Sequence, residues 1–293
     1  MSAPAAPAAP SSPGADTPAP RPARRPARTP RPASWRGVTV YAVGVLVLAI
    51  LGSIVLAGAQ DKATSAGALL FVLSPFLMAV GLRTIGREGW ADAGLRLGRE
   101  RGWYLFAVLW MPAAFAVALL VGTLTGQVHG LDGGLSLFGT LVVGGLVART
   151  LFAMFEEWGW RGYLEPRLQA LGVRGLRRHL AVGALWAVWH VPYIVAMGDE
   201  YTDVPLAAQI PLFFVAVLAM AVVTGVMRAR TGSVWPAVVE HGVANAVAFA
   251  LLDERVVVID APLVYAARPE GLVVLALLVV SAVVVWRRWG ERD

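Results

Sequence analysis

The sequence predicts an all-α protein, a polytopic transmembrane bundle of about eight spans with both termini in the cytoplasm. Three observations indicate this class: a composition poor in charge, a series of long apolar stretches, and basic residues confined to alternate loops. Of the 293 residues, 57% are hydrophobic and only 15% are charged, whereas a soluble domain carries about 25% charged residues. The mean hydropathy is +0.65. Much of the surface must therefore face lipid.

Eight apolar stretches lie between residues 38 and 287. A helix needs roughly 20 mainly apolar residues to cross the hydrocarbon core, and each stretch is of about that length. Polar loops separate the stretches. The expected limits are 38–58, 65–82, 103–124, 136–158, 180–197, 206–227, 233–252 and 270–287.

Basic residues occur in alternate loops. The segment before the first span and the loops after the second, fourth, sixth and eighth are rich in arginine, whereas the intervening loops hold few basic residues or none. The positive-inside rule predicts this alternation for eight crossings with two cytoplasmic ends. We therefore expect a multi-pass protein of the cell membrane. The bias toward Ala, Arg, Gly and Pro, with a single lysine, is typical of GC-rich bacteria and favours a bacterial cytoplasmic membrane.

Residues 1–34 differ in composition from the rest of the chain. They are rich in Ala, Pro, Ser and Arg and lack apolar periodicity, so a disordered tail is expected there, followed by one transmembrane domain over residues 35–293. The net charge of +6 does not indicate nucleic acid, because the arginines flank apolar runs. The absence of cysteine excludes disulfides, thiolate metal sites and a cysteine nucleophile.

Ionisable residues within the spans are candidates for function. Each costs at least ~2.5–3.5 kcal/mol to insert at mid-bilayer, so such residues normally face the interior of a bundle. In the fourth span Glu157 and Arg161 are four residues apart and can pair on one helix face. Glu156 is rotated by about 100° from Glu157 and is free to point elsewhere. Alternatively, both acids lie at headgroup level and only pair with Arg161.

Two further spans carry polar groups at comparable depth. By the rise of a helix, His190 lies about 15 Å, His241 about 12 Å and Glu156 about 8 Å from the cytoplasmic side. Asn245 follows His241 by one turn and shares its face. The depths predict a single site that opens to the cytoplasm. The alternative is that the histidines and the amide form interhelical hydrogen bonds only.

A carboxylate, two imidazoles and an amide are the groups that hydrolysis needs. The carboxylate can accept a proton from water, while the imidazole and amide groups hold the water and stabilise the oxyanion. Two histidines with one carboxylate also form a catalytic zinc pattern. Glu156, His190 and His241 are thus candidate ligands of a divalent metal, with zinc the expected ion.

The three motifs resemble the signature of a known family of intramembrane metalloproteases, the CAAX prenyl protease and bacteriocin-processing group, also called the CPBP or ABI family. Its signature is Glu-Glu-x-x-x-Arg, Phe-x-x-x-His and His-x-x-x-Asn or Asp on separate helices. The resemblance covers roughly residues 83–250. This chain has Glu156-Glu157 with Arg161, Trp186 with His190, His241 with Asn245, and a Trp-x-Asp-x-Gly-Leu stretch at Trp90, Asp92, Gly94 and Leu95.

The resemblance implies an intramembrane endopeptidase acting on peptides or proteins at the lipid bilayer. It implies that Glu156 is the general base and that Glu157 and Arg161 form a supporting ion pair. Binding of water, metal or oxyanion would fall to His190, His241 and Asn245. For the family both a metal-dependent and a metal-free glutamate mechanism are argued.

This chain departs from the signature at Trp186, where the family has Phe. The change keeps a large aromatic ring. We expect Trp186 to lie away from the reacting groups and to alter only the shape of the pocket.

Two other classes could use the same polar residues. A non-catalytic scaffold or a bacteriocin-immunity protein could bind a peptide in the polar core, and an ion-coupled transporter could use buried Glu and His as a proton relay. The sequence contains no inverted repeat, which disfavours the transporter. Outside the signature, Arg149 lies well inside the fourth span, and we expect it to pair with Glu240 or with an acid of the motifs. The oligomeric state is not predicted.

Overall fold

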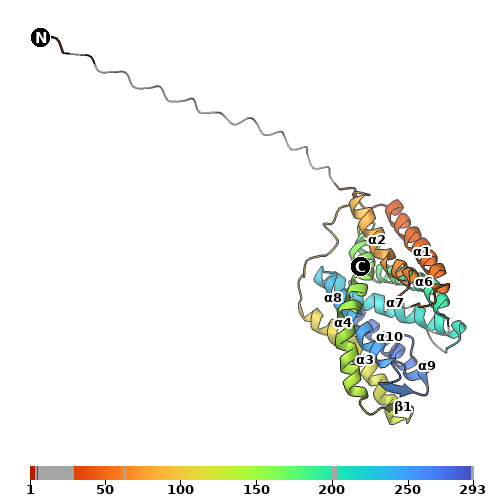
Figure 1. Ribbon diagram of the computed structural model, residues 1–293. Helices are drawn as coiled ribbons and strands as arrows, with labels where there is room; N and C mark the ends of the chain where they lie inside the picture. Colours follow the sequence, from red (N-terminus) through yellow and green to blue (C-terminus); the bar gives the residue numbers. More distant parts are fainter. Residues whose placement is uncertain (4, 6–29, 63, 199–203, 292–293) are drawn as a thin grey trace. The chain divides into compact units, whose positions relative to one another are not determined.

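A computed structural model describes residues 1–3, 5, 30–62, 64–198 and 204–291. Residues 31–293 form one compact unit built almost entirely of helices (Figure 1). The predicted all-α polytopic fold is confirmed. The expected disordered tail lies for the most part outside the described residues and stays a prediction. Within the described part, helix α1 begins at Trp35, where the Ser34 hydroxyl accepts a hydrogen bond from the backbone N–H of Gly37 at 3.1 Å.

Long helices occupy all eight predicted segments, and most helix ends agree to within a few residues. Helix α6 begins five residues earlier than expected, and α7 ends four residues later, because both helices continue through basic residues outside the apolar stretch. The helices are α1 (Trp35–Ala57), α2 (Ala66–Thr84), α3 (Gly102–Leu124), α4 (Gly134–Gly159), α6 (Gly175–Met197), α7 (Leu206–Thr231), α8 (Trp235–Leu251) and α10 (Leu272–Trp289).

Seven of these helices in the described part of the chain are long and apolar enough to cross a membrane, and α8 is the exception. With 17 residues, α8 is about 26 Å long, which is near the lower limit for a transmembrane helix. It packs against α3, α4 and α7. The seventh predicted span is therefore a short helix surrounded by other helices, which is where a helix with ionisable residues is best tolerated.

Short elements that the sequence did not predict close one end of the bundle (Figure 1). Strands β1 (Val128–Gly130) and β2 (Val257–Ile259) form an antiparallel ribbon in which His129 is paired with Val258. The ribbon joins the α3–α4 connection to the one after α8, and helix α9 (Pro262–Tyr265) follows it. The ribbon thereby connects the N-terminal end of α4 with the C-terminal end of α8.

Glycine allows the helices that hold polar residues to approach closely. A Cβ atom at Gly242, beside His241 on α8, would lie 2.7 Å from the Cα atom of Thr150 on α4. Only a glycine fits such an approach, which is the usual device for tight helix contacts in membranes. The α4–α8 contact is one of the most extensive in the structure, and it brings the acidic end of α4 beside the imidazole of α8.

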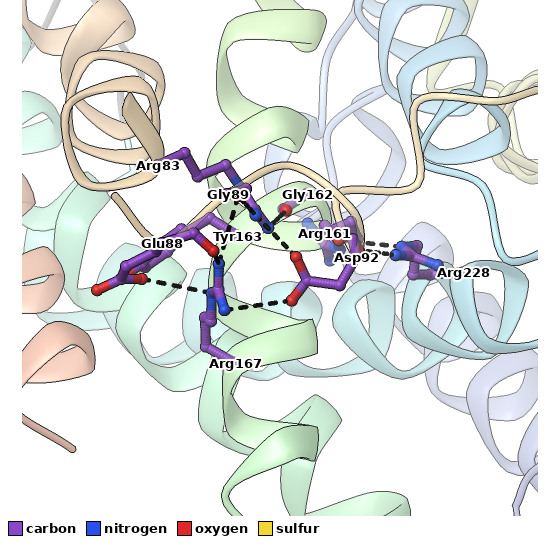
Figure 2. Close-up of polar contacts among 9 residues, drawn as sticks. All are labelled: Arg83, Glu88, Gly89, Asp92, Arg161, Gly162, Tyr163, Arg167 and Arg228. Carbon is purple, nitrogen blue, oxygen red and sulfur yellow. Dashed lines mark hydrogen bonds and ion pairs between the residues drawn. The ribbon is translucent and has the colours of Figure 1, made fainter. Parts of the chain in front are cut away.

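Arginine side chains fix the loop between α2 and α3 to the helix ends on the predicted cytoplasmic face (Figure 2). The Arg83 guanidinium donates to Asp92 Oδ1 at 2.7 Å and to the carbonyl of Gly89 at 2.5 Å. Arg167 donates to the carbonyl of Glu88 at 2.8 Å and lies 3.6 Å from Asp92 Oδ2. Since Arg83 and Arg167 are buried, these contacts supply the partners that buried guanidinium groups need.

Candidate functional site

The site is built around a single turn of π-helix. Helix α4 ends at Gly159 and continues into η1 (Trp160–Leu164), which leads into the short helix α5 (Glu165–Ala170). A π-turn has one extra residue per hydrogen-bonded ring, so it shifts the direction of the side chains that follow, and such turns are frequent at functional sites. All five residues of this π-turn are buried.

Two arginines hold the backbone of the π-turn. Arg228 of α7 donates from Nε to the carbonyl of Arg161 at 3.0 Å, and Arg83 of α2 donates to the carbonyl of Gly162 (Figure 2). Buried carbonyl groups require partners. The two guanidinium groups provide them from outside helices, and this stabilises a backbone conformation that an ordinary α-helix would not adopt.

Arg161 of this turn forms a fully buried ion pair with Glu157 of α4. Arg161 Nη1 lies 3.0 Å from the Glu157 carboxylate, and both side chains are 0% exposed. The second terminal nitrogen, Nη2, donates to the hydroxyl of Thr224 on α7 at 2.5 Å. The guanidinium also lies 4.4 Å from the centre of the Trp186 ring on α6. The predicted pairing at a spacing of four residues is thus present, and it joins α4 to α6 and α7.

Glu156 points to a different side of α4 from Glu157 and meets two other helices. Its Oε2 accepts a hydrogen bond from the indole Nε1 of Trp186 at 2.9 Å. Its Oε1 lies 4.0 Å from Nε2 of His241 on α8. Glu156 and His241 are each 6% exposed. The Oε2 atom of Glu156 is therefore held by Trp186, while Oε1 faces the imidazole of His241. The gap between Oε1 and Nε2 is wide enough for one water molecule to contact both atoms.

His241 is oriented by the neighbouring acid. Its Nδ1 lies 3.0 Å from Glu157 Oε1, and because this carboxylate is paired with Arg161, Nδ1 is the donor. Nε2 is then directed at Glu156. Asn245 follows one turn later on α8 and is half-buried. Its side chain makes no hydrogen bond with the residues that the structure describes, so its amide is available to a substrate.

His190 lies on α6 one turn after Trp186. Its Nδ1 lies 2.9 Å from the carbonyl of Trp186, and a carbonyl only accepts, so Nδ1 carries the proton and Nε2 has a free lone pair. Both imidazoles flank the same indole, with ring centres 6.0 Å (His190) and 5.6 Å (His241) from that of Trp186. The motif residues from α4, α6 and α8 thus gather around Trp186.

The donor types around Trp186 suit a divalent metal. Each imidazole has its Nδ1 bound to a carboxylate or a carbonyl, which is the usual support for a histidine that binds metal through Nε2. In the described part of the chain, however, no group of three or more His, Asp or Glu side chains is arranged so that it could hold an ion. The chemistry of Glu156, His190 and His241 fits zinc, whereas their present spacing does not assemble the set.

The expectation for Trp186 was wrong. Trp186 donates a hydrogen bond to the carboxylate of Glu156, so it directly contacts the group that is expected to be the general base. A signal was available, because indole has an N–H that the phenyl ring of Phe lacks. Thr224 was also missed, since a threonine inside an apolar span carries no spacing pattern that would connect it to Arg161.

The expected pairing of Arg149 with Glu240 or with a motif acid is also wrong. The Arg149 guanidinium lies over the ring of Phe249, 3.6 Å from its centre, and forms no ion pair with any residue that the structure describes. Phe249 follows Glu240 by nine residues, about 13 Å along α8. Arg149 therefore lies beside a later turn of α8 than the one that carries Glu240. Glu240 is 0% exposed, and its two oxygens have no hydrogen-bond partner among the described side chains and backbone.

Fold and site together define a class: polytopic helical membrane proteins with a buried cluster of carboxylate, imidazole and amide groups. Residues 138–247 match a family model described as type II CAAX prenyl endopeptidase Rce1-like. The match begins inside α4 and ends inside α8, so it includes all three motifs but not the stretch at Trp90. No curated protein matches the chain.

Over residues 138–247 the chain is thus similar to the CAAX protease-like CPBP family, and the match supports membership of it. The family is one of proteases, which supports a peptidase in general. The roles of single residues, the metal and a link to bacteriocins stay predictions.

The buried ion pair yields a prediction about stability. Replacing Arg161 by Met leaves the Glu157 carboxylate without its cation in an apolar interior, and we expect the free energy of unfolding to fall by about 3–5 kcal/mol. Thermal unfolding in detergent measures the change. The double variant Glu157→Gln/Arg161→Met removes both charges and is expected to be more stable than Arg161→Met alone. A double variant at least as unstable as the single one would contradict the account.

Proposed function

We propose that this protein is an intramembrane endopeptidase of the cytoplasmic membrane that hydrolyses peptide bonds of membrane-associated peptides or proteins. The observation that carries the proposal is the buried Glu156 carboxylate, with Oε1 directed at His241 and Oε2 held by Trp186. A carboxylate with one fixed and one available oxygen, facing an imidazole, is suited to accept a proton from water.

In the proposed reaction, water lies between Glu156 and His241. Glu156 Oε1 accepts a proton from this water while the water oxygen attacks the carbonyl carbon of the peptide bond. The amide N–H of Asn245 donates a hydrogen bond to the oxyanion that develops. Glu156 then delivers the proton to the departing nitrogen, and the C–N bond breaks. Glu157 and Arg161 do not touch the substrate; they keep His241 and Trp186 in position.

A divalent metal, with zinc the expected ion, remains part of the proposal. Glu156, His190 and His241 would have to come closer together than they lie here in order to hold it, and it would polarise water as a Lewis acid. The steps assigned above to side chains of this chain do not depend on it, and a chelator separates the two forms of the mechanism.

Glu156→Gln tests the proposal. The amide has nearly the same shape as the carboxylate but cannot accept the proton, so we expect cleavage to fall at least ~100-fold while insertion and thermal stability stay unchanged. The measurement is peptide-library cleavage by purified protein in detergent, with and without a chelator. Cleavage by Glu156→Gln at the wild-type rate would refute the proposal. Full activity after chelation would exclude the metal and leave the role of Glu156 intact.

Trp186→Phe tests the positioning of Glu156. The substitution retains a ring and restores the residue of the family signature, but it removes the N–H donor. We expect kcat to fall ~10–100-fold with KM nearly unchanged, because a hydrogen bond to a charged group is lost while the pocket stays filled. Trp189→Phe is the matched control, since the Trp189 indole donates to Ser74 on α2 at 2.8 Å and not to the site. Equal losses in both variants would show that general packing is responsible.

A further inference from the structure

A small cavity lies on the predicted cytoplasmic side of the bundle, and its lining includes no residue of the three motifs. Its volume is about 70 Å³, which is room for several water-sized groups, since one water needs roughly 10–15 Å³. Helices α5, α6 and α7 and the residues after α10 form its wall. The polar side chains of the lining are those of Glu165, Gln169, Arg178, Arg228 and Glu291. Two arginines therefore line a polar cavity that the proposed function does not use.

Arg178 of α6 has a free hydrogen-bond donor at this cavity. The residue is 1% exposed. Its Nε donates to Glu165 Oε1 at 3.3 Å, and its Nη2 donates to Glu291 Oε2 at 2.9 Å. The remaining nitrogen, Nη1, is buried and has no hydrogen-bond partner among the described residues. A buried donor without a partner is costly, so an acceptor that enters the cavity would gain a strong, charge-assisted hydrogen bond from Nη1.

Arg228 of α7 brings a second positive charge to the cavity. Its Nε and Nη2 donate to the backbone carbonyls of Arg161 and Asp92 (Figure 2). These carbonyls are neutral, and within the described part of the chain no carboxylate forms an ion pair with Arg228. The nearby carboxylate of Glu165 is engaged elsewhere, because its Oε1 lies 2.8 Å from Nδ1 of His179. The charge of Arg228 is therefore not neutralised by a direct contact.

Arg178 already holds one anion that can be exchanged. The side chain of Glu291, which follows α10, is 38% exposed, whereas that of Glu165 is 3% exposed. An ion pair with a solvent-exposed partner contributes little stability, so Glu291 can leave at low cost. Once it has left, Arg178 and Arg228 line the cavity with only Glu165 as their counter-charge. The cavity then has one positive charge in excess.

The position of the cavity favours a phosphate group as its ligand. It lies at the predicted cytoplasmic ends of α6, α7 and α10, where headgroups border the hydrocarbon core. Exposed arginines on the same ends of α6 and α10 attract anionic lipid. Basic pockets between helices on this side of a membrane bind anionic headgroups, and a guanidinium matches phosphate through paired hydrogen bonds. The exposed arginines are Arg174, Arg177, Arg287 and Arg288.

We propose that this cavity is a binding site for a phosphate group, which Arg178 and Arg228 hold after it displaces the carboxylate of Glu291. An anionic phospholipid and a soluble phosphate compound offer the same chemistry, and the experiment below distinguishes them. The site does not depend on the proposed peptidase activity. It is nevertheless connected to the motifs, because Arg228 also donates to the carbonyl of Arg161 in the π-turn.

Ligand binding to the purified protein in neutral detergent tests the site. Thermophoresis is measured with dioctanoyl phosphatidylglycerol, with dioctanoyl phosphatidylcholine and with inorganic phosphate. We expect phosphatidylglycerol to bind at least ~10-fold more tightly than phosphatidylcholine, whose headgroup has no net charge. Inorganic phosphate that binds as tightly as phosphatidylglycerol would support the site and assign it to a soluble compound. Equal binding of both lipids, with no binding of inorganic phosphate, would overturn the proposal.

Substitutions identify the residues responsible. Arg178→Gln is expected to weaken binding of phosphatidylglycerol ~10–100-fold, because hydrogen bonds to a charged group are lost. Glu291→Gln is expected to strengthen it at least ~3-fold, since the competing internal anion is removed. Arg177→Met is the matched control: it removes one exposed positive charge from the same turn of α6 without altering the lining of the cavity.

Equal losses in Arg178→Gln and Arg177→Met would show that general attraction to the basic surface is responsible, and this would overturn the site. Unchanged affinity in Glu291→Gln would also overturn it. The second result remains decisive if Arg178→Gln does not fold, because Glu291 is a partly exposed side chain outside the helices.

Discussion

The buried ion pair between Glu157 and Arg161 is the interaction on which the rest of the site depends. Both groups are 0% exposed, and a charge in that environment is tolerated only when it is paired and hydrogen-bonded. The pair satisfies the condition through three helices: Glu157 also orients His241, and Arg161 also binds Thr224 and lies against the Trp186 ring. Because Glu157 is used in this way, the adjacent acid, Glu156, is left to face the place where water and substrate would meet.

The need of buried polar and charged groups for partners also explains the arginines around the site. The π-turn that places Arg161 exposes carbonyl groups to an apolar interior, and Arg83 and Arg228 supply the missing donors. Those arginines then bind the loop between α2 and α3 through Asp92. Polar groups that would each be costly alone thus form one connected network from the loop to the Glu156 carboxylate. In a membrane interior a network of this kind must be nearly complete to be stable.

Much of the fold could be read from the sequence, because span length and the alternation of basic loops are local properties. The Glu157–Arg161 pair could be predicted for the same reason, since four residues on a helix fix the geometry. The indole N–H of Trp186 indicates a hydrogen-bond donor, but its partner Glu156 and the contact of Arg161 with Thr224 could not be predicted, because these contacts join different helices and depend on the rotation of each. The prediction for Arg149 failed for a related reason. The turn of α8 that Arg149 lies beside depends on how α4 and α8 are aligned, and the close approach at Gly242 determines that alignment. The β1–β2 ribbon is too short to leave a strand pattern.

The central claim is that Glu156 of α4 faces the imidazole of α8, and cysteine cross-linking tests it most directly because the chain has no native cysteine. The double variant Glu156→Cys/His241→Cys, treated in membranes with a short bifunctional thiol reagent, is expected to form an intramolecular link between α4 and α8 that mass spectrometry detects. Phe155→Cys/His241→Cys, in which the first thiol is rotated by about 100° on α4, is expected to link poorly. Equal linking of the two pairs, or linking of the Phe155 pair alone, would contradict the account.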